Sequence, residues 1–275
     1  MEADRHGISA SIYAKRRKLS VLVISKGNGA LGKTDKIENY YGFKKPISGK
    51  ELYQNGIQQA KNLGVEFIED EVVSVQYVEH FEVETVNSKY EAKSVILATG
   101  TNRQTPNIKG IRKFEGKGVS YCAICDAFFY KGKDVAVLGS GNYALHEAQQ
   151  LKPVVNSVTI LTNGEPIIEN RSLDVDVKSK KIREVRGDTK VEEVEFEDDT
   201  IEKVNGVFIA LGTASSNDLA RKIGARIENN HIVVDENMQT TVPGLFACGD
   251  CTGGLLQISK AVYEGAKAGL EVLKK

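Results

Sequence analysis

The sequence predicts an α/β protein in which two three-layer units each contain a parallel sheet. Apolar segments of strand length alternate with segments of helical periodicity, which is typical of parallel α/β folds. Strands end abruptly in glycine turns, first at Thr99-Gly100 and later at Gly139-Ser140-Gly141. Beyond Gly110 the strand–turn–helix pattern starts again, so we expect one unit to be inserted in the other.

The first third of the chain supplies one unit. Ser48 and Glu51 match a capping box, which marks the start of a helix. Apolar residues with a two-residue period between Val72 and Val86 indicate a hairpin. The expected elements are a helix over 7–18, a strand over 21–24, a helix over 48–64, hairpin strands over 72–75 and 81–86, and a strand over 94–98.

The rest of the chain supplies the inserted unit and the closing elements. Pro153 stops the helix after the second glycine turn, because proline lacks the amide hydrogen that a helix interior needs. The expected elements are strands over 133–138, 157–161 and 207–211, a helix over 142–151, an antiparallel insertion over 191–197, a strand over 245–248 and a helix over about 256–274.

Composition and charge exclude several classes of protein. The 275 residues carry 37 basic and 37 acidic side chains, so the formal net charge is zero. This balance gives no basic field for nucleic acid and no polybasic membrane anchor. No apolar stretch is long enough to cross a bilayer, and the amino terminus lacks a hydrophobic signal core. We therefore expect a cytoplasmic protein that binds neither nucleic acid nor membrane.

The four cysteines form two C-x-x-C pairs, and the first pair is Cys122 with Cys125. In a reducing compartment this spacing is typical of redox chemistry or metal binding. The pair precedes a strand–turn–helix unit and has Asp126 beside it, which favours a redox-active disulfide with the aspartate as proton donor or acceptor. The alternatives are a zinc half-site, which would need ligands from the distant second pair, or an inert buried pair.

The second cysteine pair and the histidines give weaker signals. Cys248 and Cys251 are either an auxiliary dithiol or two small buried residues. We favour buried residues, because a disulfide would constrain the turn between them. The histidines have no metal-ligand spacing, so we predict no metal site and interpret them as surface residues: His6, His80, His146 and His231.

The turn Gly139-Ser140-Gly141 begins a G-x-G-x-x-A motif between a strand and a helix, the Rossmann-type arrangement for a dinucleotide. The next strand should end in an acidic residue for NAD or in an arginine for NADP. It ends in Thr162-Asn163-Gly164, which supplies neither charge. The sequence therefore argues against NADPH binding.

A third signal is Asp250, which follows the strand over 245–248. A carboxylate at a strand end can accept hydrogen bonds from a ribityl hydroxyl, and the next helix can offer backbone N–H groups to a flavin ring. The alternative is an aspartate that caps a plain strand-to-helix connection.

Along nearly its whole length the chain resembles the low-molecular-weight thioredoxin reductases. The motifs occur in the family's order: Ile-Glu-Asn-Tyr-Tyr-Gly-Phe over 37–43, Ala-Thr-Gly over 98–100, Cys-Ala-Ile-Cys-Asp over 122–126, and Phe-Ala-Cys-Gly-Asp over 246–250 with Gln257 beyond. The resemblance implies bound FAD, thioredoxin as substrate and a homodimer. It also implies a discontinuous FAD-binding domain over 1–111 and 241–275, with a central dithiol domain over 112–240.

The resemblance assigns roles to individual residues. Cys122, Cys125 and Asp126 match the family's catalytic set, and we expect Cys122 to attack the partner while Cys125 faces the flavin. The closest matches to the family's flavin contacts are Asn39, Asp250 and Gln257. The wider set of expected cofactor contacts is Gly7, Ser25, Val72, Ala98, Thr99, Gly100, Gly249 and Ile258.

One departure from the family concerns the electron donor. NADPH-dependent members carry arginines where this chain has Thr162-Asn163-Gly164-Glu165-Pro166, so it is more similar to the ferredoxin-dependent flavin thioredoxin reductases. Ferredoxin is therefore the expected donor, since a flavin can collect single electrons before a two-electron step. The alternatives are an NADPH-dependent reductase, an FAD-dependent dithiol oxidase, and a flavin-free metal-binding or scaffold protein that uses the two C-x-x-C pairs.

A second departure lies at the amino end, where only Gly7 matches the family's opening strand and G-x-G-x-x-G turn. That strand would lie centrally in its sheet, where each large apolar side chain contributes about 1.5–3 kcal/mol on burial. We therefore hypothesise that the chain lacks a segment of its natural form and binds FAD poorly. Ser25 stands where many flavin domains have an acidic residue for the adenosine ribose, so we expect that contact to be weakened or replaced.

Overall fold

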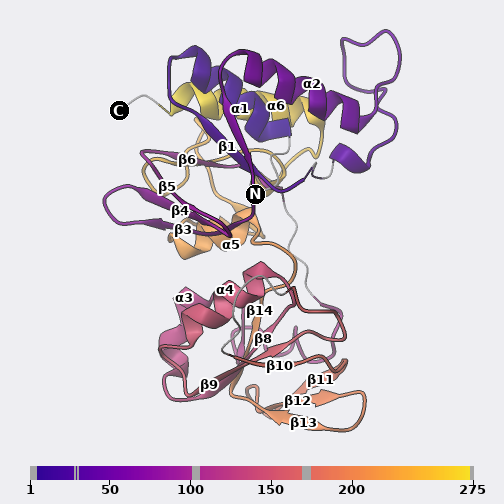
Figure 1. The fold of residues 1–275 in the computed structure, drawn as a ribbon, viewed down its shortest axis with the longest axis vertical. Coiled ribbons are helices and arrows are strands. Elements are labelled where there is room, and N and C mark those ends of the chain that lie inside the picture. Colours follow the sequence, from indigo (N-terminus) through magenta and orange to yellow (C-terminus); the bar gives the residue numbers. More distant parts are fainter. Residues whose placement is uncertain (1–4, 28, 30, 101–105, 169–174, 273–275) are drawn as a thin grey trace. The chain divides into compact units, whose positions relative to one another are not determined.

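The computed structural model describes residues 5–27, 29, 31–100, 106–168 and 175–272 (Figure 1). The chain forms two units. The first contains Met1–Asn102 and Ser215–Lys275, and the second contains Arg103–Ala214. Because the chain leaves the first unit and later returns to it, the second unit is an insertion, as the sequence predicts.

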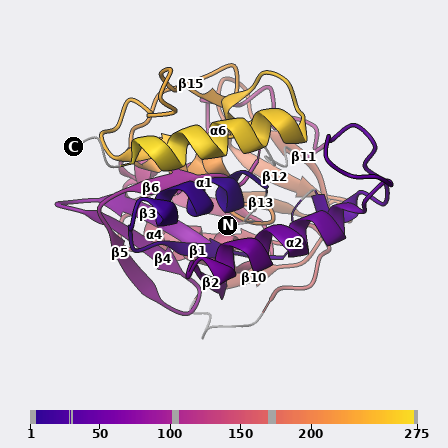
Figure 2. The ribbon, with the colours of Figure 1, turned by 90° about the horizontal axis from the view of Figure 1, so that it is seen from above.

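The first unit contains a parallel sheet in two pieces, which three helices cover on one face. Strand β1 pairs in parallel with β2, and β6 pairs in parallel with β17. Figure 2 shows α1 between α2 and α6 above these strands. The bounds are β1 Leu22–Ser25, β2 Glu66–Glu69, β6 Val95–Leu97, β17 Leu245–Ala247, α1 Arg5–Arg16, α2 Gly49–Asn62 and α6 Ile258–Glu271.

The helices of this layer pack closely for identifiable reasons. A Cβ atom on Gly269 of α6 would lie 2.3 Å from the Ala10 carbonyl oxygen of α1, so only glycine permits this approach. Ser9 adds a hydrogen bond from its Oγ to the Val262 carbonyl at 2.7 Å. Helix α2 begins after Ser48, whose side chain accepts from the Glu51 amide at 3.1 Å, as the capping pattern predicts.

The other elements of the first unit lie on the opposite face of its parallel sheet or connect its strands. An antiparallel three-stranded sheet has the order β3-β4-β5, and α5 packs on β3. The bounds are β3 Val72–Tyr77, β4 Phe81–Thr85, β5 Lys89–Ala92, α5 Ser216–Lys222, β15 Ile227–Glu228, β16 His231–Ile232, and the 3-10 turns η1 Leu31–Lys33 and η3 Asp250–Thr252.

The second unit is built on a five-stranded parallel sheet with the order β10-β9-β8-β14-β7. Helix α4 packs on β8 and β9, and α3 packs on α4. The bounds are β7 Val119–Ser120, β8 Asp134–Leu138, β9 Ser157–Leu161, β10 Asp176–Lys178, β14 Gly206–Ile209, α3 Ala123–Asp126, α4 Asn142–Leu151 and the 3-10 turn η2 Ala127–Tyr130.

An antiparallel sheet covers the other face of the second unit. Its order is β11-β12-β13, with bounds Ile182–Arg186, Glu193–Phe196 and Ile201–Lys203. Buried Val194 and Phe196 from this sheet pack in one core with Leu138 and Ile209 from the parallel sheet. The second unit therefore has three layers and a hydrophobic core of its own.

The predicted domain limits need correction at both places where the chain passes from one unit to the other. The central domain was expected to run over 112–240, but residues 215–240 belong to the first unit. There α5 packs on β3, and Lys222 Nζ donates to the Val73 carbonyl at 3.5 Å. At the other crossing, Lys109 pairs with Glu184 of β11 and Ile111 lies in the core of the second unit, so these residues do not belong to the flavin domain.

Most expected elements are present, with small shifts at their ends. The first helix ends at Arg16 rather than at Lys18, which adopts a positive φ of 66°. His146 is 2% exposed on α4, so its interpretation as a surface residue is wrong. No helix within the described ranges is both long and apolar enough to cross a membrane.

Candidate functional site

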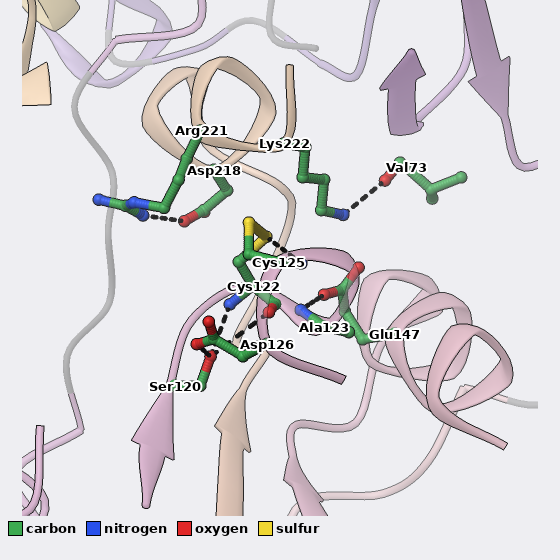
Figure 3. The surroundings of a disulfide bond; sticks show 10 residues. All are labelled: Val73, Ser120, Cys122, Ala123, Cys125, Asp126, Glu147, Asp218, Arg221 and Lys222. Atoms are coloured by element: carbon green, nitrogen blue, oxygen red, sulfur yellow. Dashed lines mark hydrogen bonds and ion pairs between the residues drawn. A yellow bond between two sulfur atoms is a disulfide. The ribbon is translucent and has the colours of Figure 1, made fainter. Parts of the chain in front are cut away.

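The first C-x-x-C pair lies where β7 turns into α3 (Figure 3). Cys122 and Cys125 form a disulfide. Cys122 is the N-cap of α3, and its Sγ accepts from the Cys125 amide at 3.2 Å. Cys122 is 2% exposed, whereas Cys125 is an exposed residue. The two sulfurs therefore differ in access to an external reactant.

Asp126 is held close to this pair by Ser120. The Ser120 hydroxyl donates to Asp126 Oδ2 at 2.6 Å and accepts from the Cys122 amide at 3.1 Å. Burial, followed by the charge of Asp126, raises the pKa of half-buried Tyr130 on η2. Ser120 thus links the carboxylate to the backbone of the first cysteine.

A second carboxylate reaches the same turn from α4. Glu147 is 2% exposed, and its Oε2 accepts from the Ala123 amide at 3.0 Å (Figure 3). Ala123 is the first residue of α3 and follows Cys122 directly. Glu147 was not predicted from the sequence, because a single glutamate on a helix carries no pattern that distinguishes it from a solvent-exposed one.

The glycine turn before α4 is constrained by its neighbours. A Cβ atom on Gly139 would lie 2.2 Å from the Ala210 carbonyl oxygen and 2.8 Å from Ala144 Cβ. The Ser140 carbonyl accepts from the Ile168 amide at 2.9 Å. At the end of β9, Asn163 Oδ1 accepts from the Ile182 amide at 2.7 Å. The loop after β9 therefore lies against the turn that would receive a pyrophosphate.

Two of the expected flavin contacts meet in the first unit. Asn39 Nδ2 donates to Gln257 Oε1 at 2.9 Å, although 218 residues separate them in sequence. Gln257 is the N-cap of α6 but makes no side-chain cap hydrogen bond. Its side chain therefore joins Asn39 rather than the first turn of its own helix, and leaves the amino end of α6 with backbone N–H groups of the kind that attract electron-rich ligands.

The loop between β17 and α6 is fixed by an ion pair. Gly249 has a φ of 86°, and its amide donates to Glu264 Oε2 at 2.7 Å. Lys260 Nζ donates to the Gly249 carbonyl at 2.7 Å and lies 3.1 Å from Glu264 Oε2. Asp250 begins η3 directly after this peptide. The predicted contacts Gly249 and Asp250 thus stand on a loop held by two residues of α6 that the sequence analysis missed.

The end of β6 lies beside the start of α5. The Thr99 amide donates to Ser216 Oγ at 3.1 Å, and the two hydroxyl groups also form a hydrogen bond. Gly100 follows with a φ of 71°, a conformation that glycine adopts at low cost. Ser216 was not predicted, although the capping box of Ser215 with Asp218 marks the start of α5 in the sequence.

The remaining expected contacts are distributed over the first unit. Ser25 is the last residue of β1, and its carbonyl accepts from the Asp70 amide at 2.9 Å. The other positions are Gly7 within α1, Val72 at the start of β3, Ala98 after β6 and Ile258 at the start of α6. None of these residues belongs to the unit that carries the disulfide.

The second cysteine pair is buried and reduced. Cys248 and Cys251 are both 0% exposed and form no disulfide. Burial raises the pKa of Cys251 to about 12 and raises that of Cys248 well above its ordinary value. Cys251 Sγ lies 3.3 Å from the Cys248 carbonyl oxygen. These thiols stay protonated at neutral pH, which agrees with the interpretation as small buried residues.

Similarity to known proteins extends over nearly the whole chain. A family model described as pyridine nucleotide-disulphide oxidoreductase matches residues 6–265. The thioredoxin reductase of Aquifex aeolicus (strain VF5) is 36% identical over 289 residues, which cover 98% of this chain and 89% of that protein.

Two solved structures extend this similarity. The atypical thioredoxin reductase TRi from Desulfovibrio vulgaris Hildenborough is 35% identical, with a TM-score of 0.93 over 99% of this chain and 95% of that one. A ferredoxin-flavin thioredoxin reductase from Clostridium acetobutylicum is 32% identical, with a TM-score of 0.71 over 98% of this chain and 94% of that one. The chain therefore belongs to the pyridine nucleotide-disulphide oxidoreductase family and, within it, to the low-molecular-weight thioredoxin reductases.

Proposed function

We propose that this protein is a flavin-dependent thioredoxin reductase that uses the Cys122–Cys125 disulfide. The observation that carries the proposal is the disulfide itself, placed at the start of a short helix with Asp126 and Ser120 beside it. A dithiol in this position can exchange with a protein disulfide. The buried second pair has no comparable access.

The first unit offers contacts for the ring end of FAD. Asn39 and Gln257 meet at the amino end of α6, and the loop over 249–253 is held rigidly by Lys260 and Glu264. These residues fit a flavin. When bound, FAD would supply the two electrons that open the disulfide.

The protein's own residues then carry out thiol chemistry. Two electrons break the S–S bond, and protonation, assisted by Asp126, yields two thiols. One thiolate attacks the disulfide of thioredoxin and forms a mixed disulfide; the second attacks that bond, restores Cys122–Cys125 and releases reduced thioredoxin. We assign the first attack to Cys125, since Cys122 is 2% exposed. This reverses the assignment made from the sequence.

Ferredoxin is the donor that we propose, ahead of NADPH. Three features of the second unit support this: the absence of arginine over 162–166, the hydrogen bond that the Ile182 amide donates to Asn163 Oδ1, and the hydrogen bond that the Ile168 amide donates to the Ser140 carbonyl. The first leaves a 2′-phosphate without the arginine that usually binds it, and the other two engage loop residues near the glycine turn in contacts within the protein. The name of the Clostridium acetobutylicum relative points to the same donor. A homodimer and a cytoplasmic location stay predictions from the resemblance.

The first test identifies the electron donor from the flavin absorbance and the rate of thioredoxin reduction. With FAD in excess, reduced ferredoxin should bleach the flavin absorbance and support thioredoxin reduction, while NADPH should leave the flavin oxidised. Rapid bleaching by NADPH alone would instead establish the NADPH-dependent alternative. Oxygen consumption with a dithiol substrate would establish the oxidase.

Cysteine variants then test the dithiol. Cys122→Ser and Cys125→Ser should each lower turnover at least about 100-fold, because the exchange needs both sulfurs. Only Cys122→Ser, which keeps Cys125, should form a mixed disulfide with a thioredoxin variant that lacks its resolving cysteine and whose remaining cysteine is activated as a disulfide with 5-thio-2-nitrobenzoate. The Cys125 thiolate then attacks that disulfide and releases the nitrobenzoate thiolate. The matched control is Cys251→Ser, which changes a cysteine of the buried pair and should retain turnover. Unchanged turnover in both of the first two variants would refute the proposed function.

A further inference from the structure

Ser120 lies at the centre of the hydrogen bonds around the disulfide. It is the last residue of β7 and is 4% exposed. Its hydroxyl donates to Asp126 Oδ2 at 2.6 Å and accepts from the Cys122 amide at 3.1 Å (Figure 3). The Cys122 carbonyl oxygen is farther away, at 3.4 Å, so the single hydroxyl hydrogen is directed to the carboxylate.

The two ends of this hydrogen bond differ in how firmly the fold holds them. Ser120 is paired in register with Phe208 of β14, so the parallel sheet fixes its backbone. Asp126 ends the four-residue helix α3, and the residue is partly exposed. Within the described residues, the only side chain that donates a hydrogen bond to this carboxylate is that of Ser120. The strand therefore determines where the carboxylate at the helix end lies.

The other titratable groups near Asp126 come from the two elements that pack on α3. Helix α4 carries His146 and Glu147, and both are 2% exposed. The turn η2 carries Tyr130, whose pKa is raised by burial and then by the charge of Asp126. Neither Glu147 nor Tyr130 can offer the carboxylate a positive charge, so the Ser120 hydroxyl is the contact that restrains it.

We propose that Ser120 is a positioning residue that acts through Asp126, and this role rests on the proposed function. In the exchange with a disulfide substrate, a thiol of the reduced pair must lose its proton before its sulfur can attack. Asp126 accepts that proton, and the buried hydroxyl keeps the carboxylate at the turn that carries both sulfurs. When reduction opens the Cys122–Cys125 bond, the same carboxyl group returns a proton to a thiolate.

A purely structural role for Ser120 predicts a different behaviour. The hydroxyl also satisfies the amide of buried Cys122, and its loss would leave that amide without this acceptor. Such a loss would weaken the turn equally at every pH. A role through Asp126 would instead change how the rate depends on pH, because the carboxylate is needed only while the thiols are protonated.

The test follows oxidation of the reduced pair by oxidised glutathione. The whole chain is reduced with dithiothreitol, freed of reductant and mixed with oxidised glutathione between about pH 6 and about pH 10. One glutathione thiolate leaves at each of the two steps, and the Cys122–Cys125 disulfide forms again. Samples are quenched with acid and alkylated, and mass spectrometry measures the fraction of pairs that has been oxidised.

Ser120→Ala should change both the rate and its pH dependence. At about pH 6 the oxidation should be at least about 10-fold slower, and its rate should rise about tenfold per pH unit, since only spontaneously formed thiolate then reacts. The original protein should show a shallower rise, because Asp126 removes the thiol proton at low pH. At about pH 10, where the thiols are ionised in both proteins, the two rates should agree within about 2-fold.

Ser120→Thr and Ser120→Val form a matched pair, because the two new side chains share a shape and differ in the hydroxyl group. Ser120→Thr should bring the rate to within about 3-fold of the original and restore the slope, and Ser120→Val should behave like Ser120→Ala. Ser157→Ala is the control in the same unit. It removes a hydroxyl that donates to Asp134 at 2.5 Å, at the amino ends of β8 and β9, and should change neither rate nor slope.

A double variant tests the route through Asp126. Asp126→Asn should show the steep slope by itself, and adding Ser120→Ala should slow the oxidation by no more than about 2-fold, because residues that act through one group are not additive. If Ser120→Ala does not fold, Asp126→Asn decides, since an unchanged slope in that variant removes the group through which Ser120 acts.

Three results would overturn the role of Ser120: a loss of rate that is equal at every pH, additive losses in the double variant, or no recovery with Ser120→Thr. The assay contains neither thioredoxin nor an electron donor. Failure to reduce thioredoxin would therefore reject the proposed function and leave this result standing.

Discussion

At the scale of single residues, Glu147 is the unexpected member of the disulfide site. It brings a buried carboxylate to the amide of Ala123, next to Cys122. A negative charge near a sulfur disfavours the thiolate, while the hydrogen bond fixes the start of α3. We infer that Glu147 is a positioning residue that also restrains the reactivity of the reduced pair.

Glu147→Gln should therefore make the reduced pair more reactive. The variant keeps the shape of the side chain and removes its charge, so alkylation of the reduced thiols at neutral pH should become about 3- to 10-fold faster. The reduction potential of the disulfide should rise as well. The measurements are the pH dependence of iodoacetamide reaction and redox titration against glutathione.

Two comparisons make this prediction specific to charge at that position. Glu147→Asp keeps the charge and should stay near the original rate. Glu202→Gln removes a carboxylate of the same unit that pairs with Lys178 instead, and it should have no effect on the thiols. Equal acceleration by all three variants would show a general loosening of the unit and contradict the role of Glu147.

Sequence patterns pointed to the residues that stand in motifs with a recognisable chemical role. The C-x-x-C pair, Asp126, and the partners Asn39 and Gln257 all carried a signal, and the structure brings the last two together across 218 residues. Glu147, Lys260 and Glu264 carried none, because each acts through a three-dimensional contact with a backbone amide or carbonyl. Exposure also had to come from the structure, and it is the basis on which we propose Cys125 rather than Cys122 as the attacking cysteine.

At the scale of elements, the turn between β8 and α4 shows that glycine in this motif has a packing role. Gly139 allows the Ala210 carbonyl and Ala144 to approach the start of the helix, which is a sufficient reason for glycine at this position. The motif was therefore a correct indicator of strand–turn–helix structure.

Gly139→Ala should destabilise the second unit. Its Cβ would lie 2.2 Å from the Ala210 carbonyl oxygen, and such overpacking costs about 1–3 kcal/mol in the free energy of unfolding. Gly141→Ala is the matched control, because its nearest neighbour is the Gly212 carbonyl oxygen at 3.3 Å and the expected loss is under about 1 kcal/mol. Urea unfolding followed by circular dichroism measures both, and a larger loss for Gly141→Ala would contradict the packing argument.

The positions of helices and strands were predictable where the hydrophobic periodicity agrees with the glycine and proline residues that end an element. Helix α4 and strand β9 have the expected limits, since a glycine turn and Pro153 frame the helix and an apolar run defines the strand. Helix α5 was missed despite its capping box, because it is short. Strand β2 was missed because glutamates occupy both of its ends. The domain limit at 240 failed for the same reason, since the unrecognised α5 carries the chain back to the first unit.

At the scale of the whole molecule, the buried thiols make stability depend on pH. In the folded protein, burial raises the pKa of Cys251 from an ordinary 9.0 to about 12. The unfolded chain then ionises first, so stability is complete below about pH 9 and is lost as pH rises toward 12. Between these two pH values, the free energy of unfolding falls by up to about 1.4 kcal/mol per pH unit for each such thiol.

Urea midpoints of the first unit measured between about pH 8 and about pH 11 should therefore decline, and Cys251→Ala should reduce the slope. Cys122→Ser leaves the buried pair intact and serves as the control with an unchanged slope. A slope that is the same in all three proteins would assign the alkaline loss to other groups.

The insertion of the second unit has a practical consequence. Its first and last parallel strands, β7 and β14, are hydrogen-bonded neighbours, and its core is drawn entirely from its own residues. Residues 103–214 thus contain the pairing partners that close their own sheet, and the segment should fold when produced alone. The product would be a small cofactor-free carrier of sulfur chemistry, suited to grafting onto other reductants.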